Sequence, residues 1–216
     1  MHKRGMVAVK ICGITNWADA RTAIDAGAGA LGFNFYARSP RRVAVSHARE
    51  IVRHMPRKVS AVGVFVDASA ADVLKIAREV KLGVLQLHGE ESPKIVKELA
   101  REFPVIKAFR VGPQFKVEEL VKYSDASAFL LDAFDSKLRG GTGKEFDWRI
   151  VTRVRRLGPV ILAGGLTKEN AAKAIRTARP FAIDVCSGVE CAPGKKDAKK
   201  VREFMKAVQR KRGEEG

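Results

Sequence analysis

The chain alternates between short apolar runs rich in β-branched residues and amphipathic helical patterns, and it repeats this alternation eight times. Most of the apolar runs are nearly continuous, as expected for parallel strands that are buried on both faces. The expected strands are Val7–Cys12, Ala30–Phe35, Ser60–Val66, Val84–His88, Val105–Phe109, Ala128–Asp132, Val160–Ala163 and Phe181–Val185. The expected helices are Trp17–Ala26, Ser46–Met55, Ala70–Val80, Pro93–Glu102, Val117–Tyr123, Trp148–Arg156, Lys168–Ala178 and Ala198–Arg210.

Two architectures are built from such strand–helix units, a closed (β/α)8 TIM barrel and an open doubly wound sheet. The 216 residues give 27 residues per unit, which suits a barrel near the lower end of the usual size, about 200 residues. A doubly wound sheet usually carries a glycine-rich dinucleotide motif after its first strand, and Cys12-Gly13-Ile14-Thr15 is not one. We therefore expect an α/β fold with a single (β/α)8 barrel domain over residues 1–216. Its active site is expected at the C-terminal ends of the strands.

The net charge of +17 allows two interpretations, a nucleic-acid-binding face or a solvated surface around a site for anionic substrates. We favour the second, because Lys and Arg are spread over many expected helices and aromatic residues make up only 7% of the chain. Nucleic acid is therefore not expected as a partner. The densest basic stretch, from Lys195 to Arg212, predicts an amphipathic helix with one face on the core.

No part of the sequence predicts membrane insertion or export. Its apolar runs stay well short of the roughly 18 residues that span a membrane, and no signal peptide is expected ahead of the first strand. Cys12, Cys186 and Cys191 are expected to be free thiols in a reducing compartment, so we predict a cytoplasmic protein. The spacing of these cysteines does not indicate a zinc site, and no metal is expected.

Chemically distinctive residues fall at the ends of the expected strands. Cys12 ends the first strand and Asp132 ends the sixth, so a barrel would place a thiol and a carboxyl on opposite sides of its mouth. A partly desolvated carboxyl with a raised pKa suits a general acid, and a thiolate suits a base. An isolated cysteine is more often a small buried apolar residue, and spacing identifies no cation that would ionise this one. Together, the two residues predict proton transfer.

Two further residues at strand ends are candidates for substrate binding. His88 follows the fourth strand, where we expect it to contact substrate or to make a structural hydrogen bond. Arg41, in the loop after the second strand, can hold a carboxylate in a bidentate fork. Its neighbours Arg38 and Arg42 are alternatives that spacing does not exclude, and a solvated basic loop is a third interpretation.

The loops after the seventh and eighth strands predict a phosphate site, as they do in many barrels. Gly164 and Gly165 let the backbone approach a ligand closely, and Ser187-Gly188 opens a turn whose N–H groups can point the same way. The glycine-rich segment Gly140–Lys144 is interpreted as a lid over the ligand. Its glycine spacing is not that of a nucleotide P-loop.

Several sequence blocks, in this order, resemble phosphoribosylanthranilate isomerase of tryptophan biosynthesis. The blocks are Lys10–Thr15, Gly32–Tyr36, Ser39–Arg41, Gly63–Val66, Leu85–Glu90, Leu131–Asp132, Gly140–Lys144, Phe146–Trp148, Ala163–Leu166 and Asp184–Glu190. None is decisive alone, but the ordered set covers nearly the whole chain and is very specific.

This resemblance implies a (β/α)8 barrel that performs an Amadori rearrangement without a metal or organic cofactor. The implied substrate is a small phosphosugar, N-(5-phosphoribosyl)anthranilate, and the product is 1-(2-carboxyphenylamino)-1-deoxyribulose 5-phosphate. Carried over to the matching positions, Cys12 is the general base, Asp132 is the general acid and Arg41 holds the anthranilate carboxylate. The remaining implied site residues are His88 and Asp184 for the sugar and the backbone of Gly164, Gly165, Ser187 and Gly188 for phosphate.

One position departs from the resemblance, because Cys186 stands where a serine or another small residue is expected beside Ser187. Two alternative functions stay open: another phosphosugar isomerase on a barrel, or a basic nucleic-acid-binding barrel. The first alternative would carry an aspartate at the position of Cys12. A monomer and a homodimer are both compatible with the sequence.

Overall fold

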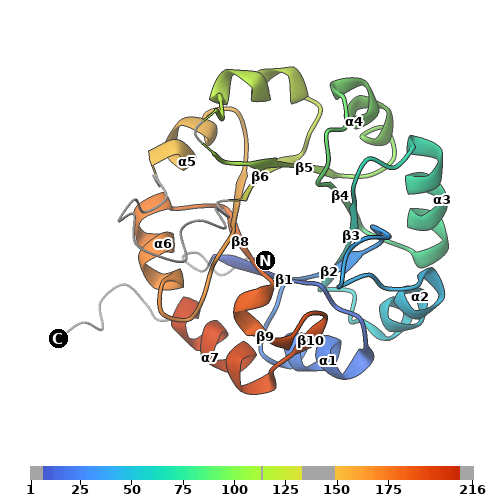
Figure 1. Cartoon of the computed structure of the whole chain (residues 1–216), viewed down its shortest axis with the longest axis vertical. Coiled ribbons are helices and arrows are strands. Elements are labelled where there is room, and N and C mark those ends of the chain that lie inside the picture. Colours follow the sequence, from blue (N-terminus) through green and yellow to red (C-terminus); the bar gives the residue numbers. More distant parts are fainter. Residues whose placement is uncertain (1–6, 113, 133–148, 210–216) are drawn as a thin grey trace.

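The computed structural model describes residues 7–112, 114–132 and 149–209, which form the closed parallel barrel that the sequence predicts (Figure 1). β1 pairs in parallel with both β2 and β8, and this pairing closes the barrel. Every strand begins and ends within one residue of its expected bounds. The strands are β1 (Ala8–Cys12), β2 (Ala30–Asn34), β3 (Ser60–Phe65), β4 (Val84–Leu87), β5 (Val105–Arg110), β6 (Ala128–Asp132), β7 (Val160–Ala163) and β8 (Ala182–Val185).

Helices surround the strands as an outer ring (Figure 1). The described helices are α1 (Trp17–Asp25), α2 (Val45–His54), α3 (Ala70–Val80), α4 (Pro93–Leu99), α5 (Arg149–Val154), α6 (Ala171–Ala178) and α7 (Ala198–Gln209), with the 3₁₀ helix η1 (Val117–Tyr123) after β5. Asn16 caps α1, since its side-chain oxygen accepts a hydrogen bond of 2.9 Å from the backbone N–H of Asp19. The basic helix α7 buries Val201, Phe204 and Met205, so its apolar face packs on the core as predicted.

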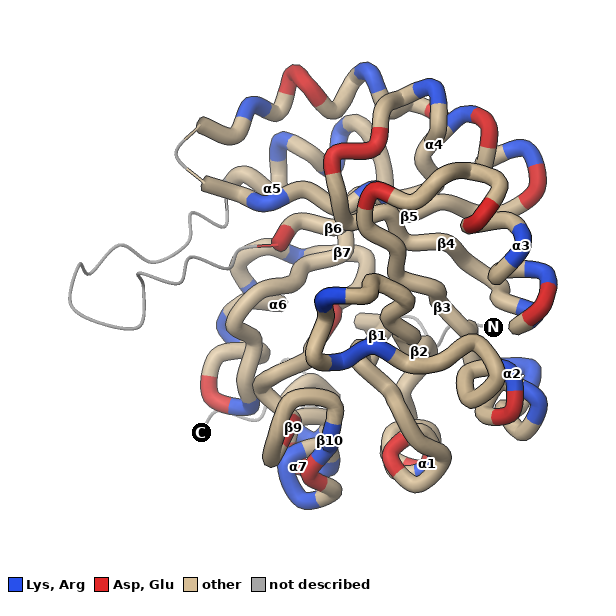
Figure 2. The backbone as a smooth tube through the Cα atoms, turned by 45° about the vertical axis from the view of Figure 1, so that its right-hand side comes forward, with Lys and Arg blue, Asp and Glu red and all other residues tan. Residues whose placement is uncertain are grey.

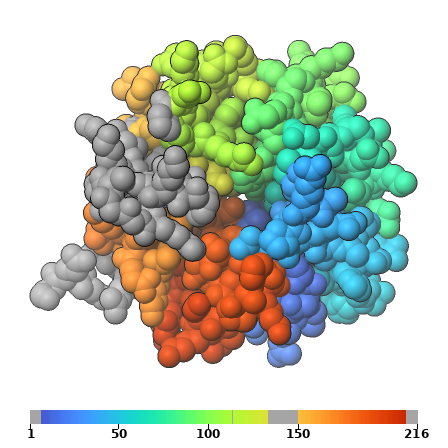
Figure 3. All heavy atoms as spheres, in the orientation of Figure 1, coloured from blue at the N-terminus to red at the C-terminus, as the bar shows by residue number. Residues whose placement is uncertain are grey.

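The chain adds a short segment after β8 that the sequence did not predict. It consists of the 3₁₀ helix η3 (Ser187–Val189) and an antiparallel hairpin of β9 (Glu190–Ala192) and β10 (Lys195–Lys196). This hairpin lies beside the loop after β2, where the blue and red parts of the chain meet in the space-filling view (Figure 3). The hydroxyl of Thr15 donates a 2.6 Å hydrogen bond to the carbonyl of Gly194, which ties the hairpin to the end of β1.

Apolar side chains form two clusters. The larger one lies between strands and helices, and the smaller one joins alternate positions of β3 and β5–β8. Such alternation places the smaller set inside the barrel, which is therefore packed with side chains rather than open. Its buried members are Val62, Ile106, Ala108, Ala128, Leu130, Ile161, Ala163 and Ala182.

Charged residues cover the outer helices rather than one face. Figure 2 shows Lys and Arg distributed around the barrel with Asp and Glu between them. This distribution fits the interpretation of the net charge as a solvated surface. Over the described residues, the helices are all too short or too polar to cross a membrane.

Candidate active site

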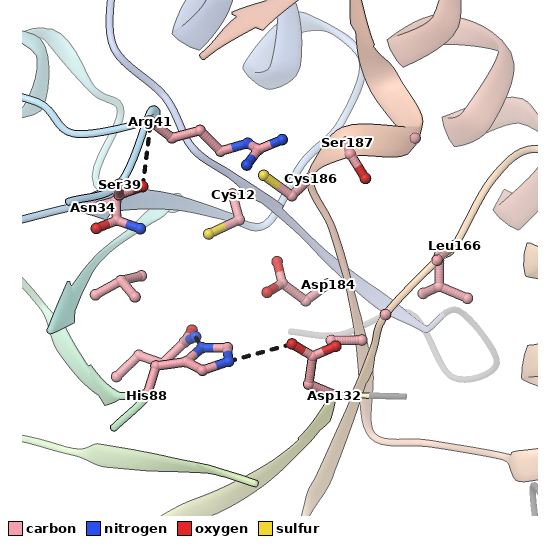
Figure 4. A pocket seen from close by; sticks show the side chains of 16 residues that line it. Cys12, Asn34, Ser39, Arg41, His88, Asp132, Leu166, Asp184, Cys186 and Ser187 are labelled. Carbon is pink, nitrogen blue, oxygen red and sulfur yellow. Dashed lines mark hydrogen bonds and ion pairs between the residues drawn. The ribbon is translucent and has the colours of Figure 1, made fainter. Parts of the chain in front are cut away.

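A cavity of about 400 Å³ opens at the C-terminal ends of the strands (Figure 4). It lies where a (β/α)8 barrel places its active site. The structure brings all of the predicted site residues to its walls, namely Cys12, Arg41, His88, Asp132, Gly164, Gly165, Asp184, Ser187 and Gly188. Asn34, Ser39, Gln86 and Cys186 also line it.

Strand register places a buried ion pair directly below Cys12. Lys10 of β1 lies opposite Asp184 of β8, and their Nζ and Oδ2 atoms are 2.8 Å apart. Side chains of a strand alternate between its two faces, so Cys12 shares the inner face with Lys10. The Lys10 side chain is 4% exposed and that of Asp184 is 8% exposed. No cation that would favour the Cys12 thiolate could be identified from residue spacing. In the structure, Lys10 is such a cation.

The surroundings of Cys12 favour the thiolate. A hydrogen bond with the thiol of Cys186 is the strongest influence and, with the charges of Lys10 and Lys196, it lowers the pKa of Cys12 well below its usual value. Burial acts in the opposite direction but is outweighed. Burial alone would lower the pKa of Lys10, yet the charges of Asp184 and Cys12 raise it, so the lysine stays protonated. Cys12 is therefore an ionised base held beside a permanent cation.

Asp184 presents an unsatisfied oxygen atom to the cavity. Its Oδ2 is paired with Lys10, whereas the buried Oδ1 has no hydrogen-bond partner among the described residues. Burial raises the pKa of Asp184 to about 7, and the charge of Lys10 offsets only part of this effect. A buried polar atom without a partner is costly, so Oδ1 is suited to a hydroxyl group of a bound ligand.

Across the cavity, His88 contacts Asp132. The Nε2 atom of His88 lies 3.3 Å from Oδ2 of Asp132, and its Nδ1 lies 2.9 Å from the amide nitrogen of Gln86 (Figure 4). With that amide as donor, Nδ1 accepts and Nε2 carries the hydrogen that points at Asp132. His88 was predicted to contact substrate or make a structural hydrogen bond; the structure shows its contact with Asp132, and its role in substrate binding stays a prediction.

Arg41, rather than Arg38 or Arg42, reaches the cavity. Its Nε and Nη2 form a bidentate ion pair with Glu190 at 2.7–3.1 Å. Lys196 Nζ also contacts this carboxylate at 2.9 Å. The hydrogen bonds that Arg41 donates to Glu190 raise the pKa of Arg41 against the effect of burial. The guanidinium group of Arg41 is thus held at the cavity wall, and its Nε–Nη2 edge already binds Glu190.

The loops after β7 and β8 form one end of the cavity. Gly164 and Gly165 have φ angles of 88° and 59°, a conformation that favours glycine. A Cβ atom on Gly188 would overlap the carbonyl oxygen of Leu166. Only glycine therefore allows η3 to approach the β7 loop this closely, so that backbone N–H groups and the exposed Ser187 border the same end of the cavity.

The family model described as N-(5′-phosphoribosyl)anthranilate (PRA) isomerase matches residues 9–207. The chain belongs to the N-(5′-phosphoribosyl)anthranilate isomerase family. A member from Trichlorobacter lovleyi is 47% identical over 202 residues, which cover 93% of this chain and 97% of the relative. A member from Geobacter sulfurreducens is 46% identical over 201 residues, covering 93% and 98% of the two chains.

Solved structures of this isomerase family share the barrel. The phosphoribosyl anthranilate isomerase of Thermotoga maritima superposes with a TM-score of 0.87 at 41% identity, covering 94% of this chain and 99% of that one. A second family structure, in complex with reduced 1-(o-carboxyphenylamino)-1-deoxyribulose 5-phosphate, gives 0.85 at 40% identity with the same coverage. The chain is accordingly an isomerase with the predicted (β/α)8 fold.

Sequence reasoning missed several residues that complete this isomerase pocket. Lys10, Gln86, Glu190 and Lys196 are each buried and charged or polar, and each supports a neighbouring predicted residue through the contacts described above. For Lys10 and Gln86, the signal in the sequence is a polar residue within a buried strand, whereas Glu190 and Lys196 lie on the short hairpin and have no local signal. The interpretation of Gly140–Lys144 as a lid lies outside the described residues.

Proposed function

We propose that this pocket converts N-(5-phosphoribosyl)anthranilate into its 1-deoxyribulose isomer, with Cys12 as general base and Asp132 as general acid. The observation that carries the proposal is the arrangement of these two groups in one cavity. Cys12 is ionised beside Lys10, while Asp132 is oriented by His88 on the other side. Family membership names the substrate class, and a solved relative holds a reduced form of the corresponding product.

In the first step, the carboxyl group of Asp132 donates a proton to the furanose ring oxygen. The bond between this oxygen and C1′ then breaks, and the nitrogen lone pair forms a protonated imine with C1′. This imine makes the proton on C2′ acidic. A general acid in this position typically accelerates such a step by about 10²–10⁴-fold.

In the second step, the thiolate of Cys12 removes the C2′ proton, and the electron pair moves to give an enolamine. The enolamine tautomerises to the aminoketone, in which C1′ gains a proton and the C2′ hydroxyl loses one. Cys12 then releases the proton that it took from C2′ and Asp132 takes one up, which restores the starting protonation of the site. Lys10 does not touch the substrate in this scheme, but together with Cys186 and Lys196 it lowers the pKa of Cys12 and so favours the thiolate before each turnover. No step requires a metal or an organic cofactor.

The other predicted residues bind the substrate. The Oδ1 atom of Asp184 accepts a hydrogen bond from a ribose hydroxyl, and His88 lies beside the same sugar. The backbone around Gly164, Gly165, Ser187 and Gly188 receives the phosphate, because N–H groups at the start of a helical turn favour anions. Arg41 offers its remaining edge to the anthranilate carboxylate.

The test is a fluorescence assay that follows the consumption of phosphoribosylanthranilate. Cys12→Ala and Asp132→Ala are each expected to lower kcat by about 10²–10⁴-fold while product affinity is retained. Cys191→Ala is the matched control, since Cys191 is exposed and does not line the cavity. Full activity in either cavity variant would contradict the assignment.

The cytoplasmic location, the choice between monomer and homodimer, and the absence of nucleic-acid binding stay predictions. A solved relative from Thermotoga maritima is described as dimeric, and size-exclusion chromatography would test the state of this chain. Filter binding across a salt series would test for nucleic acid, whose phosphate contacts give a steep salt dependence.

A further inference from the structure

Cys12, the last residue of β1, and Cys186, the residue that follows β8, both line the cavity. The β1–β8 register pairs Ile11 with Val185, so the next residues along the two strands, Cys12 and Cys186, are neighbours. Both side chains line the cavity and neither is in a disulfide (Figure 4), and each cysteine strongly shifts the pKa of the other. Adjacent strands lie about 4.8 Å apart, close to the Cα separation of about 4.4–6.8 Å that a disulfide needs.

The two thiols differ in a way that gives them different chemical roles. Cys12 is ionised, whereas its negative charge and the hydrogen bond between the two thiols raise the pKa of Cys186, which keeps its proton. Lys196 Nζ lies 3.8 Å from the Cys186 sulfur and acts in the opposite direction, as does Arg41. One thiol is therefore a nucleophile, and the other is a protonated neighbour that lies close to two cations and donates to the carboxylate of Glu190, 3.8 Å from its sulfur.

We propose that Cys12 and Cys186 form a peroxide-sensitive dithiol site, in which oxidation joins them in a disulfide and reversibly removes the base from the cavity. This function goes beyond the isomerase reaction, and it uses Cys186, which stands where a serine or another small residue is expected beside Ser187. The oxidant is a small hydroperoxide, which is smaller than any phosphosugar that the 400 Å³ cavity admits.

In the first step, the Cys12 thiolate attacks one oxygen atom of hydrogen peroxide and the O–O bond breaks. The leaving hydroxide takes a proton and becomes water, and Cys12 becomes a neutral sulfenic acid. The negative charge that kept Cys186 protonated is then gone. Lys196 and Arg41 remain, and their charges favour the Cys186 thiolate.

In the second step, the sulfur of Cys186 attacks the sulfur of the sulfenic acid. The S–S bond forms and the S–O bond breaks, and hydroxide leaves as a second water after it takes up the Cys186 proton. In total, two thiols lose two electrons and two protons while one peroxide is reduced to two waters. A dithiol reductant restores both thiols by exchange.

The third cysteine provides an internal reference. Cys191 lies on β9, is exposed and hydrogen-bonds only to the carbonyl of Lys195 among the described residues. Among the described residues, no Lys or Arg side chain contacts its sulfur, whereas Lys196 Nζ lies 3.8 Å from the sulfur of Cys186. The proposal thus predicts an order of reaction that accessibility alone would reverse.

The experiment exposes the folded chain to one equivalent of hydrogen peroxide at neutral pH and maps the thiols by mass spectrometry. We expect two of the three thiols to be lost together, as a Cys12–Cys186 cross-link that is two hydrogen atoms lighter, while Cys191 stays reduced. Dithiothreitol should restore both thiols. In Cys186→Ser, the hydroxyl cannot form a disulfide, so excess peroxide should drive Cys12 to the sulfinic acid, which dithiothreitol does not reduce.

Cys191→Ser is the matched control and should give the same cross-link as the parent chain. The proposal is overturned if Cys191 is oxidised before Cys12, or if Cys12 of the parent chain reaches the sulfinic acid without a cross-link. It is also overturned if Cys186→Ser recovers its Cys12 thiol as fully as the parent. Because the readout is the mass of cysteine peptides, its result is independent of the reaction that the cavity catalyses.

Discussion

Replacing Lys10 with methionine tests the electrostatic basis of the site. Methionine keeps much of the length and apolar stem of lysine but removes the charge that lies between Cys12 and Asp184. If Lys10 holds Cys12 ionised, the pKa of this cysteine must rise in Lys10→Met. The direction follows from charge alone, because a nearby cation stabilises a thiolate more than a thiol.

The size of the shift can be bounded. A unit charge about 4 Å from the thiolate contributes about 4 kcal/mol at an effective dielectric constant of about 20, which corresponds to about 3 pKa units. The loss of Lys10 also removes the partner of Asp184, whose pKa burial already raises to about 7. That carboxyl then takes up a proton and no longer repels the thiolate, so the net rise for Cys12 is about 1 to 2 units.

The assay is the rate of iodoacetamide alkylation of Cys12 against pH, in a Cys186→Ser, Cys191→Ser background that leaves one cysteine. The alkylation midpoint should move up by about 1 to 2 pH units in Lys10→Met. Asp184→Asn is the matched control, because it removes a negative charge at the same ion pair and should move the midpoint down. Circular dichroism checks that both variants are folded. A midpoint that is unchanged in Lys10→Met, or that moves the same way in both variants, would refute the reasoning.

Three further predictions follow from packing and linkage. Gly188→Ala places a methyl group on a backbone carbonyl and should weaken phosphate binding by at least about tenfold in calorimetry, whereas Gly112→Ala, in open space, should not. Lys107 of β5 and Glu91 form a buried ion pair with a distance of 2.8 Å between Nζ and Oε2. Lys107→Met leaves the buried Glu91 without this cation and should lower the urea-measured free energy of unfolding by about 3–5 kcal/mol, with partial recovery when Glu91→Gln is added. Burial raises the pKa of Asp184 from 3.8 to about 7. Between these pH values the folded state binds more protons than the unfolded state, so the free energy of unfolding falls as pH rises. Asp184→Asn should flatten this dependence of stability on pH.

The strands were predictable because their physical signal is local. A strand buried on both faces must be apolar along its length, and each run from β1 to β8 shows this in the sequence. The hairpin of β9 and β10 gave no such signal, since its two strands have only three and two residues and carry Lys195 and Lys196. The segment at 117–123 was expected to be helical, and its tighter 3₁₀ form is not encoded in an apolar period.

The positions of the site residues were predictable for a related reason. Once a barrel is inferred, the end of each strand is known, and Cys12 and Asp132 must then face one cavity. The partners of these residues depend instead on register between strands that are far apart in sequence. Nothing local to Lys10 indicates that Asp184 lies opposite it, and nothing local to Arg41 indicates that Glu190 occupies its fork.

The pairing of β1 with β8, which closes the barrel, determines when the Cys12 thiol becomes reactive during synthesis of the chain. β1 and β8 are the first and last barrel strands, so the Lys10–Asp184 pair joins residues 174 positions apart. Such distant contacts form only after the loop-closure entropy of the intervening chain is overcome. A nascent chain that ends before β8 has the Cys12 thiol and Lys10 but lacks Cys186 and Lys196, both of which lower the pKa of Cys12 in the complete barrel. The thiolate therefore emerges with completion of the last strand, and unfinished or truncated chains carry an ordinary, weakly reactive cysteine.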